Sequence, residues 1–130
     1  MDSAGRPLIL VVDDNDTIRN LVATILGSQD MDVALASDGE EALTFIEQRR
    51  PDVMLLDLSM PRVDGLEVLR RVRTHPTLND LRIVMLTAVA SAPRFQEAFS
   101  FHPDGYLEKT FRVNDLIGQI RQALDRDQPS

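Results

Sequence analysis

The segment LILVVDDNDT, residues 8–17, places five apolar residues directly before Asp13, Asp14 and Asp16. An uninterrupted apolar run of this kind, bounded by polar residues, is typical of a strand that is buried on both faces. Carboxylates gathered at the end of such a strand repel one another. The sequence must therefore supply positive charge at this point, either from another part of the chain or from a bound cation.

The composition is that of one globular domain, with 43% apolar and 27% charged residues among 130. No apolar run approaches the ~20 residues that span a membrane. The N-terminal MDSAGRP has neither the basic nor the apolar region of a secretory signal, and cysteine is absent, so we expect a cytoplasmic protein. A net charge of -7 with scattered Lys and Arg argues against direct binding of nucleic acid.

Four more short apolar segments follow the first, and we interpret all five as strands. They comprise residues 8–12, 31–36, 52–58, 82–88 and 105–108. Apolar residues spaced three and four apart, which are typical of helices, lie between these segments and after the last one. Strands that alternate with helices pair in parallel, with the helices on both faces of the sheet. The sequence therefore predicts a doubly wound α/β fold in which a strand and a helix alternate five times.

The helical periodicity is clearest in the first and last of these helices. It comprises Ile18, Leu21, Val22, Ile25 and Leu26 in the first, and Val113, Leu116, Ile117, Ile120 and Leu124 in the last. We expect both sets to face the core. Phe95, Phe99 and Phe101 should lie mostly in it, although one exposed member could serve a partner surface. Asp38 and Asp64 each stand three residues before a Glu, a spacing that predicts a capped helix N-terminus.

Polar side chains collect where the expected strands end. Asp13 and Asp14 follow the first strand, Asp57 ends the third, Thr87 ends the fourth, and Lys109 follows the fifth. The carboxyl ends of parallel strands share one edge, where open α/β sheets bind ligands. Two carboxylates about 4 Å apart repel by up to ~4 kcal/mol at an effective dielectric of about 20. A hard divalent cation relieves this repulsion, and Mg²⁺ suits an all-oxygen site beside a lysine.

A carboxylate beside a divalent cation and an ammonium group is suited to phosphoryl transfer. The charge on the transferred oxygens is then shared among the cation, the ammonium and hydrogen-bond donors. Asp57 is the candidate nucleophile, because Asp13 and Asp14 are more useful as metal ligands. An acidic helix N-terminus is the ordinary alternative for this pair, and it is the role that we assign to Asp16.

Four fragments, VVDDND, DVMLLDLSMPRVDGLEVL, VMLTA and DGYLEKTF, resemble the CheY-like receiver domain of two-component response regulators. The resemblance extends over about residues 7–125. It leaves residues 1–6 as an N-terminal tail and residues 126–130 as a C-terminal tail or the start of a linker. It implies a flavodoxin-like sheet of order 2-1-3-4-5. It also implies a phosphoryl acceptor with at most slow Mg²⁺-dependent self-dephosphorylation, rather than an enzyme. The donor would be a histidine kinase, a histidine phosphotransfer protein or a small acyl phosphate.

The resemblance also implies the ligands of the metal. Asp14, Asp57 and the backbone carbonyl of Ser59 would bind Mg²⁺ directly, whereas Asp13 would act through water.

The remaining implied roles concern the phosphoryl group and the response to it. Lys109 would pair with that group, and the Thr87 hydroxyl and the Ala88 N–H would donate to its oxygens. Tyr106 would be an aromatic switch that turns inward as Thr87 moves. The fourth helix, fifth strand and fifth helix would then form the surface that meets a downstream effector or a second copy of the chain.

The sequence departs from the family pattern at three places. Thr110 follows Lys109, where the family has a proline after a cis bond. Because a cis bond before a residue other than proline costs ~3–4 kcal/mol, we predict a trans bond here. His102 and Pro103 replace a Gly followed by Ala, so the left-handed backbone conformation in that turn is less favourable. Val63 replaces a methionine, which is only a packing change.

Three other functions compete with this interpretation. A haloacid-dehalogenase-like phosphatase would use the D-x-D of DND from Asp14, but it leaves Asp57 unexplained. A flavodoxin needs a phosphate-binding loop after the first strand, where acidic residues repel phosphate. A receiver-like interaction module that is not phosphorylated stays open, chiefly because of Thr110.

Overall fold

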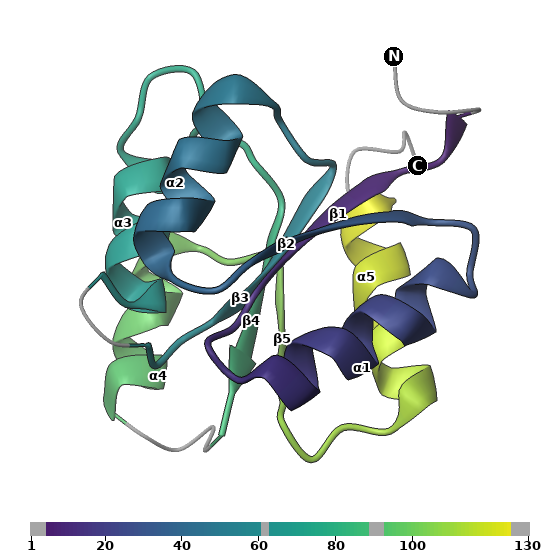
Figure 1. Cartoon of the computed structure of the whole chain (residues 1–130). Coiled ribbons are helices and arrows are strands. Elements are labelled where there is room, and N and C mark those ends of the chain that lie inside the picture. Colours follow the sequence, from purple (N-terminus) through teal and green to yellow (C-terminus); the bar gives the residue numbers. More distant parts are fainter. Residues whose placement is uncertain (1–4, 61–62, 89–92, 126–130) are drawn as a thin grey trace.

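The computed structural model describes residues 5–60, 63–88 and 93–125, and in them a parallel sheet lies between two layers of helices (Figure 1). The strands are β1 (Leu8–Val12), β2 (Asp32–Ala36), β3 (Val53–Asp57), β4 (Ile83–Thr87) and β5 (Gly105–Glu108). The helices are α1 (Asp16–Gly27), α2 (Gly39–Gln48), α3 (Gly65–Arg73), α4 (Pro93–Ala98), the 3-10 turn η2 (Phe99–Phe101) and α5 (Val113–Leu124). The strand order is β2-β1-β3-β4-β5, so the predicted fold is confirmed.

The sheet has a separate apolar core on each face. Leu10 and Val12 of β1 pack with residues of α2, α3 and α4, whereas Ile9 and Val11 pack with residues of α1 and α5. Figure 1 shows the same division, with α1 and α5 on one side of the sheet. β1, β3 and β4 are buried along their whole length, which fixes the positions at which their last residues emerge.

The predicted caps of α2 and α3 are confirmed. The Asp38 side chain accepts a hydrogen bond from the Glu41 N–H, and the Asp64 side chain accepts one from the Glu67 N–H. Glu41 in turn accepts from the Ser37 N–H, one residue before the cap. Each cap satisfies a backbone donor that the first helical turn leaves without a partner.

Two expectations about the core were wrong. Leu21 of α1 is 48% exposed and Val113 of α5 is 52% exposed, although both share the periodicity of buried neighbours. Leu21 lies at the margin of the apolar stripe of α1, and Val113 is the first residue of α5. Phe99 is 45% exposed, because α4 ends at Ala98 and the chain continues in η2, while Phe95 is buried.

Two departures from the family pattern have the predicted backbone geometry. No cis peptide bond occurs in the described ranges, so the Lys109–Thr110 bond is trans. His102 adopts a left-handed conformation, with φ 54° and ψ 61°. This conformation costs a residue other than glycine roughly 1–2 kcal/mol, so the turn into β5 needs other interactions to hold it.

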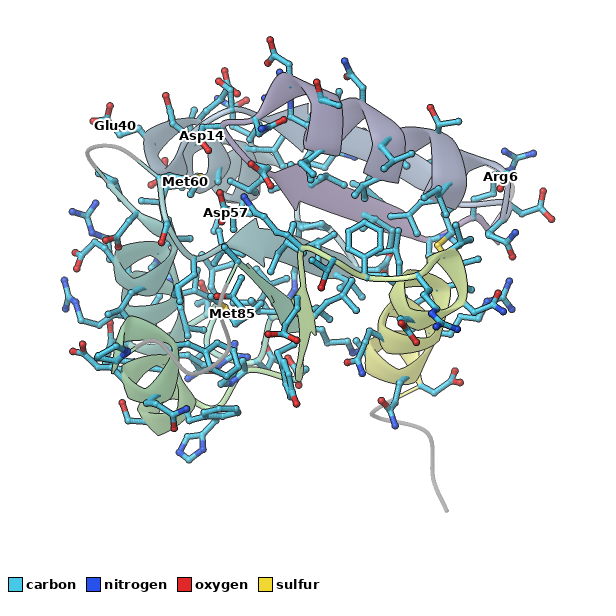
Figure 2. The ribbon with its side chains drawn as sticks, turned by 90° about the horizontal axis from the view of Figure 1, so that it is seen from below. Arg6, Asp14, Glu40, Asp57, Met60 and Met85 are labelled. Carbon is cyan, nitrogen blue, oxygen red and sulfur yellow. The ribbon has the colours of Figure 1, made fainter. Side chains whose placement is uncertain are left out.

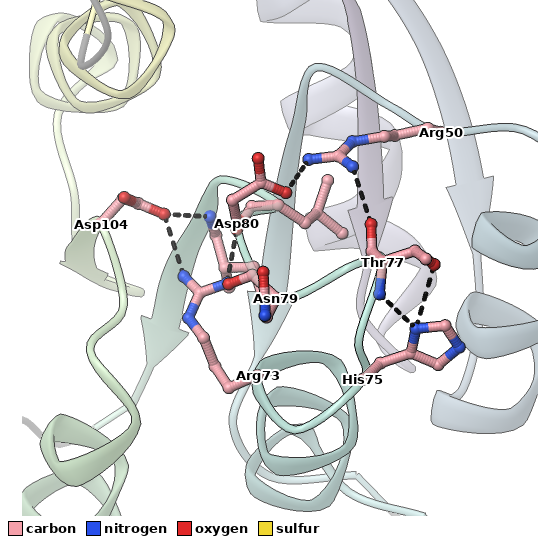
Figure 3. Close-up of polar contacts among 9 residues, drawn as sticks. Arg50, Arg73, His75, Thr77, Asn79, Asp80 and Asp104 are labelled. Carbon is pink, nitrogen blue, oxygen red and sulfur yellow. Dashed lines mark hydrogen bonds and ion pairs between the residues drawn. The ribbon is translucent and has the colours of Figure 1, made fainter.

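Arg73, at the end of α3, supplies those interactions (Figure 3). Its guanidinium donates to the carbonyls of Phe101, His102 and Leu81 at 3.0, 3.1 and 2.6 Å. It also lies 3.1 Å from a carboxylate oxygen of Asp104, which accepts the Ile83 N–H at 2.7 Å. The side chains are only 11% and 7% exposed, so the pair is largely shielded from water. Arg73 thus joins α3, the start of β4 and the turn before β5.

A second, exposed set of contacts lies beside the Arg73 network at the amino ends of the strands (Figure 3). Arg50 pairs with Asp80 at 2.6 Å and donates to the Thr77 carbonyl at 3.2 Å, and the Thr77 N–H donates to His75. Exposed ion pairs stabilise little, because water and salt screen them. The Arg73 network is therefore the stronger connection at this end of the sheet.

No helix among the described residues has both the length and the apolar character to cross a membrane.

Replacing Arg73 with methionine is expected to lower the free energy of unfolding by about 3–5 kcal/mol, because a buried carboxylate and several carbonyls lose their partner. Urea denaturation of purified protein measures the loss. Arg71→Met is the matched control, since Arg71 lies in the same helix but pairs with Glu67 at the surface. An Arg73 variant as stable as the Arg71 variant would show that the network does not hold the turn.

Candidate metal and phosphoryl site

The carboxyl ends of the strands bring the expected polar residues to one edge of the sheet. β1 and β3 are neighbours, so Asp13 and Asp14, just after β1, lie near Asp57 at the end of β3. Figure 2 shows Asp14 and Asp57 at the same end of the sheet, far from Arg6, which precedes β1. Thr87 ends β4, the other neighbour of β3, and is buried. The edge predicted from the sequence is therefore present.

The loop after β1 holds its two aspartates in different surroundings. Asp13 is fully buried and Asp14 is exposed. The Asp13 N–H donates to the Ala36 carbonyl at 3.2 Å, and Asp13 Oδ1 accepts the Asn15 N–H at 2.9 Å. Asn15 caps α1 by accepting the Ile18 N–H. Asp16 lies in the first turn of α1, as expected, and does not belong to the acidic cluster.

Asp57 lies at the base of the site, where its side chain is 1% exposed. One carboxylate oxygen accepts the Ser59 N–H at 3.2 Å, and the other lies 3.2 Å from the Lys109 ammonium. The loop beyond it passes two glycines at very short range. A Cβ on Gly65 would lie 2.0 Å from the Asp57 carbonyl oxygen, and one on Gly39 would lie 2.1 Å from that of Val63. Any larger residue at these helix starts would displace the segment that carries Asp57.

Lys109 is the cation that the described part of the chain places beside these carboxylates. Its backbone N–H donates to the Thr87 carbonyl at 2.8 Å, which holds the residue at the end of β5. Its ammonium lies 3.3 Å from Asp13 Oδ2 and 3.2 Å from Asp57 Oδ2. Burial lowers the pKa of Lys109, but the charges of Asp57 and Asp13 outweigh burial and hold that pKa above its usual value. Lys109 therefore stays positively charged at neutral pH.

The surroundings of Asp57 strongly raise the pKa of its carboxyl group. Burial and the negative charge of Asp13 raise the pKa of Asp57 to about 7, even though Lys109 and the Ser59 N–H act in the opposite direction. Burial and the charge of Asp13 together thus outweigh the Lys109 ammonium. Added positive charge beside Asp57 would favour its ionised form.

The acidic cluster is suited to a divalent cation. Asp13, Asp14 and Asp57 each offer a carboxylate oxygen, and the three oxygens lie within 4.8 Å of one another. Asp13 Oδ2 is buried and accepts no hydrogen bond from the described residues, although the Lys109 ammonium lies nearby. Buried oxygens without a donor are costly unless a cation or water meets them. Carboxylate oxygens are the ligands that Mg²⁺ and Ca²⁺ prefer, so the cluster fits a hard cation.

The other predicted residues lie around this cluster in different ways. Ser59 lies two residues after Asp57, and Ala88 lies directly after Thr87. Both residues are exposed. Tyr106 is 46% exposed and is therefore not a core aromatic. Its ring meets the edges of Phe95 and Phe99, with ring centroids 5.1 and 6.2 Å away. In this structure Tyr106 points outward.

The chain matches the family model of the response regulator receiver domain over residues 9–121. It belongs to the response regulator receiver domain family. Among curated relatives, the response regulator MprA of Mycobacterium leprae (strain TN) is 40% identical over 121 residues, which cover 93% of this chain and 52% of that protein. This receiver domain thus spans about half the length of such relatives.

Solved structures of receiver domains have the same fold. The chemotaxis response regulator CheY4 of Vibrio cholerae superposes with a TM-score of 0.84 at 31% identity, covering 91% of this chain and 98% of that one. The receiver domain of the Francisella response regulator 1452 gives a TM-score of 0.85 at 29% identity, covering 95% and 100%. The resemblance stated from the sequence motifs is therefore confirmed.

Sequence reasoning missed two residues that shape the site. Arg19 donates to the Asp13 carbonyl at 2.7 Å, and Gly65 packs against the Asp57 carbonyl. Arg19 is a charged residue in the expected first helix and carries no periodic signal. Gly65 was visible only as part of the DGLE cap, which gave no sign of its close approach to Asp57.

Replacing Asp57 with asparagine is expected to stabilise the metal-free protein at high pH. The raised pKa means that the folded protein keeps a proton which the unfolded chain releases, so Asp57 lowers stability as pH rises from about 4 to about 7. At pH 8 the variant should be more stable by on the order of 3 kcal/mol, and at pH 4 the difference should vanish. Thermal unfolding followed by circular dichroism measures both.

Magnesium provides the control for this comparison. Mg²⁺ at pH 8 should stabilise the wild type more than the variant, because binding to the folded state alone raises stability and the variant lacks one ligand. Equal unfolding midpoints of the metal-free wild type and variant from pH 4 to pH 8 would contradict the electrostatic account.

Proposed function

We propose that this chain is a phosphoacceptor that takes a phosphoryl group on Asp57 in the presence of Mg²⁺. The observation that carries the proposal is the buried Asp57 carboxylate, which lies 3.2 Å from the Lys109 ammonium and within one acidic cluster with Asp13 and Asp14. The donor is a histidine kinase or a histidine phosphotransfer protein, and a small acyl phosphate would serve in its place. Membership of the receiver family supports this choice of donor.

The reaction is a displacement at phosphorus by a carboxylate oxygen of Asp57. A new oxygen–phosphorus bond forms while the bond from phosphorus to the donor's imidazole nitrogen or acyl oxygen breaks, and the donor leaves with that electron pair. Asp57 must be ionised to attack, and its pKa of about 7 without metal makes this a real requirement. A bound Mg²⁺ supplies positive charge that favours the ionised carboxylate and offsets charge on the phosphoryl oxygens.

The chain's own donors complete the site in this proposal. The Lys109 ammonium, already at hydrogen-bond distance from Asp57, pairs with the phosphoryl group. The Thr87 hydroxyl and the Ala88 N–H donate to its oxygens. Preorganised donors of this kind stabilise the charge that spreads over the transferred group.

The proposed metal ligands are those expected from the sequence. Asp14, Asp57 and the Ser59 carbonyl bind Mg²⁺ directly, and Asp13 acts through water. The exposure of Asp14 supports its place as a direct ligand, because Mg²⁺ keeps several waters and a ligand at the rim allows them.

Signalling follows from a rearrangement of Thr87 and Tyr106. Tyr106 is half exposed in this structure, so an inward turn would change the surface of α4, β5 and α5, to which an effector or a second copy binds. The receiver unit extends over residues 7–125, and its location is the cytoplasm. The match covers 52% of the relative MprA, which supports an effector function that lies outside this chain.

Incubation with acetyl phosphate and Mg²⁺ is expected to add one phosphoryl group, because the proposed acceptor is a single residue, Asp57. Intact-mass spectrometry at neutral pH detects the gain. Asp57→Asn abolishes it. Asp52→Asn keeps it, because the Asp52 side chain accepts the Leu8 N–H at the opposite end of β3.

Three outcomes separate the candidate functions. A gain that persists in Asp57→Asn would contradict the assignment of the acceptor. No gain from acetyl phosphate or a phosphorylated histidine phosphotransfer protein would favour the interaction module. Hydrolysis of phosphate esters that depends on Asp14 and not on Asp57 would favour the hydrolase.

A further inference from the structure

The two metal-binding aspartates of the β1–α1 loop are held by an arginine one helical turn further along the chain. Arg19 of α1 turns back over the loop, and one terminal nitrogen of its guanidinium donates to the Asp13 carbonyl at 2.7 Å. The other terminal nitrogen pairs with the Asp16 carboxylate. The Arg19 side chain is only 14% exposed, whereas that of Asp16 is 80% exposed. The bond to the Asp13 carbonyl is therefore partly shielded from water, and the pair with Asp16 lies at the surface.

We propose that Arg19 is a positioning residue for magnesium, which presents the carboxylates of Asp13 and Asp14 to the ion. This inference rests on the proposed function, because it concerns the same metal site. The Arg19 guanidinium donates to the backbone carbonyl of Asp13, which is not one of the carboxylate oxygens proposed to face the metal. Arg19 therefore acts through the backbone that joins Asp13 and Asp14.

The peptide unit between Asp13 and Asp14 is the part that Arg19 fixes. A peptide is planar, so fixing its carbonyl oxygen also fixes the direction in which the next Cα lies. The preceding peptide is held by the bond from the Asp13 N–H to the Ala36 carbonyl, and the Asp13 side chain is held by the Asn15 N–H. The Arg19 bond is therefore the contact that orients Asp14 relative to Asp13.

The guanidinium itself is well oriented for this purpose. Its planar group reaches two acceptors at once, the Asp13 carbonyl and the Asp16 carboxylate, and a lysine ammonium lacks this fork. The Arg19 N–H also donates to the Asn15 carbonyl at 3.0 Å in the first turn of α1. Loop and helix start thus form one unit around Arg19.

The charge of Arg19 and its positioning role predict opposite changes in Mg²⁺ affinity when Arg19 is replaced. A cation near three carboxylates opposes the binding of a dication, so charge alone predicts tighter Mg²⁺ binding when Arg19 becomes neutral. Loss of positioning predicts weaker binding, because the free loop must be ordered by the metal. The sign of the change in affinity therefore decides between the two.

The test is a calorimetric titration of the metal-free full chain with MgCl₂ at pH 8. We expect Arg19→Gln to bind Mg²⁺ roughly 10-fold more weakly than the wild type, a loss typical of residues that orient metal ligands. Arg19→Lys keeps the charge and one donor and should fall between the two. Arg121→Gln on α5 is the charge-matched control, because Arg121 contacts Gln29 and lies outside the acidic cluster; it should bind as the wild type does.

The results separate this inference from the proposed function. Unchanged or tighter binding by Arg19→Gln, with a wild type that binds Mg²⁺, overturns the positioning role alone. A wild type that does not bind Mg²⁺ overturns both. Circular dichroism confirms that each variant is folded, since a purely structural role would lower the melting temperature without changing the affinity. If Arg19→Gln does not fold, Arg19→Lys decides: affinity equal to wild type overturns the role, and weaker binding supports it.

Discussion

The crowding of carboxylates around one ammonium group is the interaction on which the rest of this structure depends. Asp13 and Asp57 are buried and share Lys109, whose ammonium lies 3.3 and 3.2 Å from their carboxylate oxygens. The balance is incomplete, because the pKa of Asp57 is still raised to about 7. Buried like charges oppose folding unless a cation joins them. Such a site lowers the stability of the metal-free protein, and a cation that binds the folded state would restore it.

The fold holds this unfavourable arrangement in place from several directions. β1 and β3 are buried on both faces, so their ends cannot separate without exposing the core. Gly65 leaves room for the chain beyond Asp57, and Arg19 ties down the peptide after Asp13. At the opposite ends of the strands, Arg73 fixes the turn into β5 and thus the strand that leads to Lys109. Packing and hydrogen bonds therefore offset the electrostatic strain of the site.

Sequence patterns predicted the features that depend on local order. The bounds of β1 and β5, the caps at Asp38 and Asp64, and the gathering of Asp13, Asp14 and Asp57 all follow from periodicity or from the parallel direction of strands. Periodicity failed at Leu21 and Val113, because it shows an apolar stripe and not how much of that stripe a neighbour covers. Arg73 escaped prediction because its acceptors lie up to 31 residues away along the chain. The roles of Ser59, Ala88 and Tyr106 rest on the resemblance to the family and stay predictions.

A crystal structure of the protein grown in MgCl₂ tests the central claim most directly. The account predicts one ion at the end of β1 and β3, with carboxylate oxygens of Asp14 and Asp57 and the Ser59 carbonyl about 2.1 Å from it and waters completing an octahedron. The Lys109 ammonium should stay beside Asp57. An acidic cluster without an ion at saturating magnesium, with Asp13, Asp14 and Asp57 still together, would show that the chain balances these charges by itself and would contradict the account.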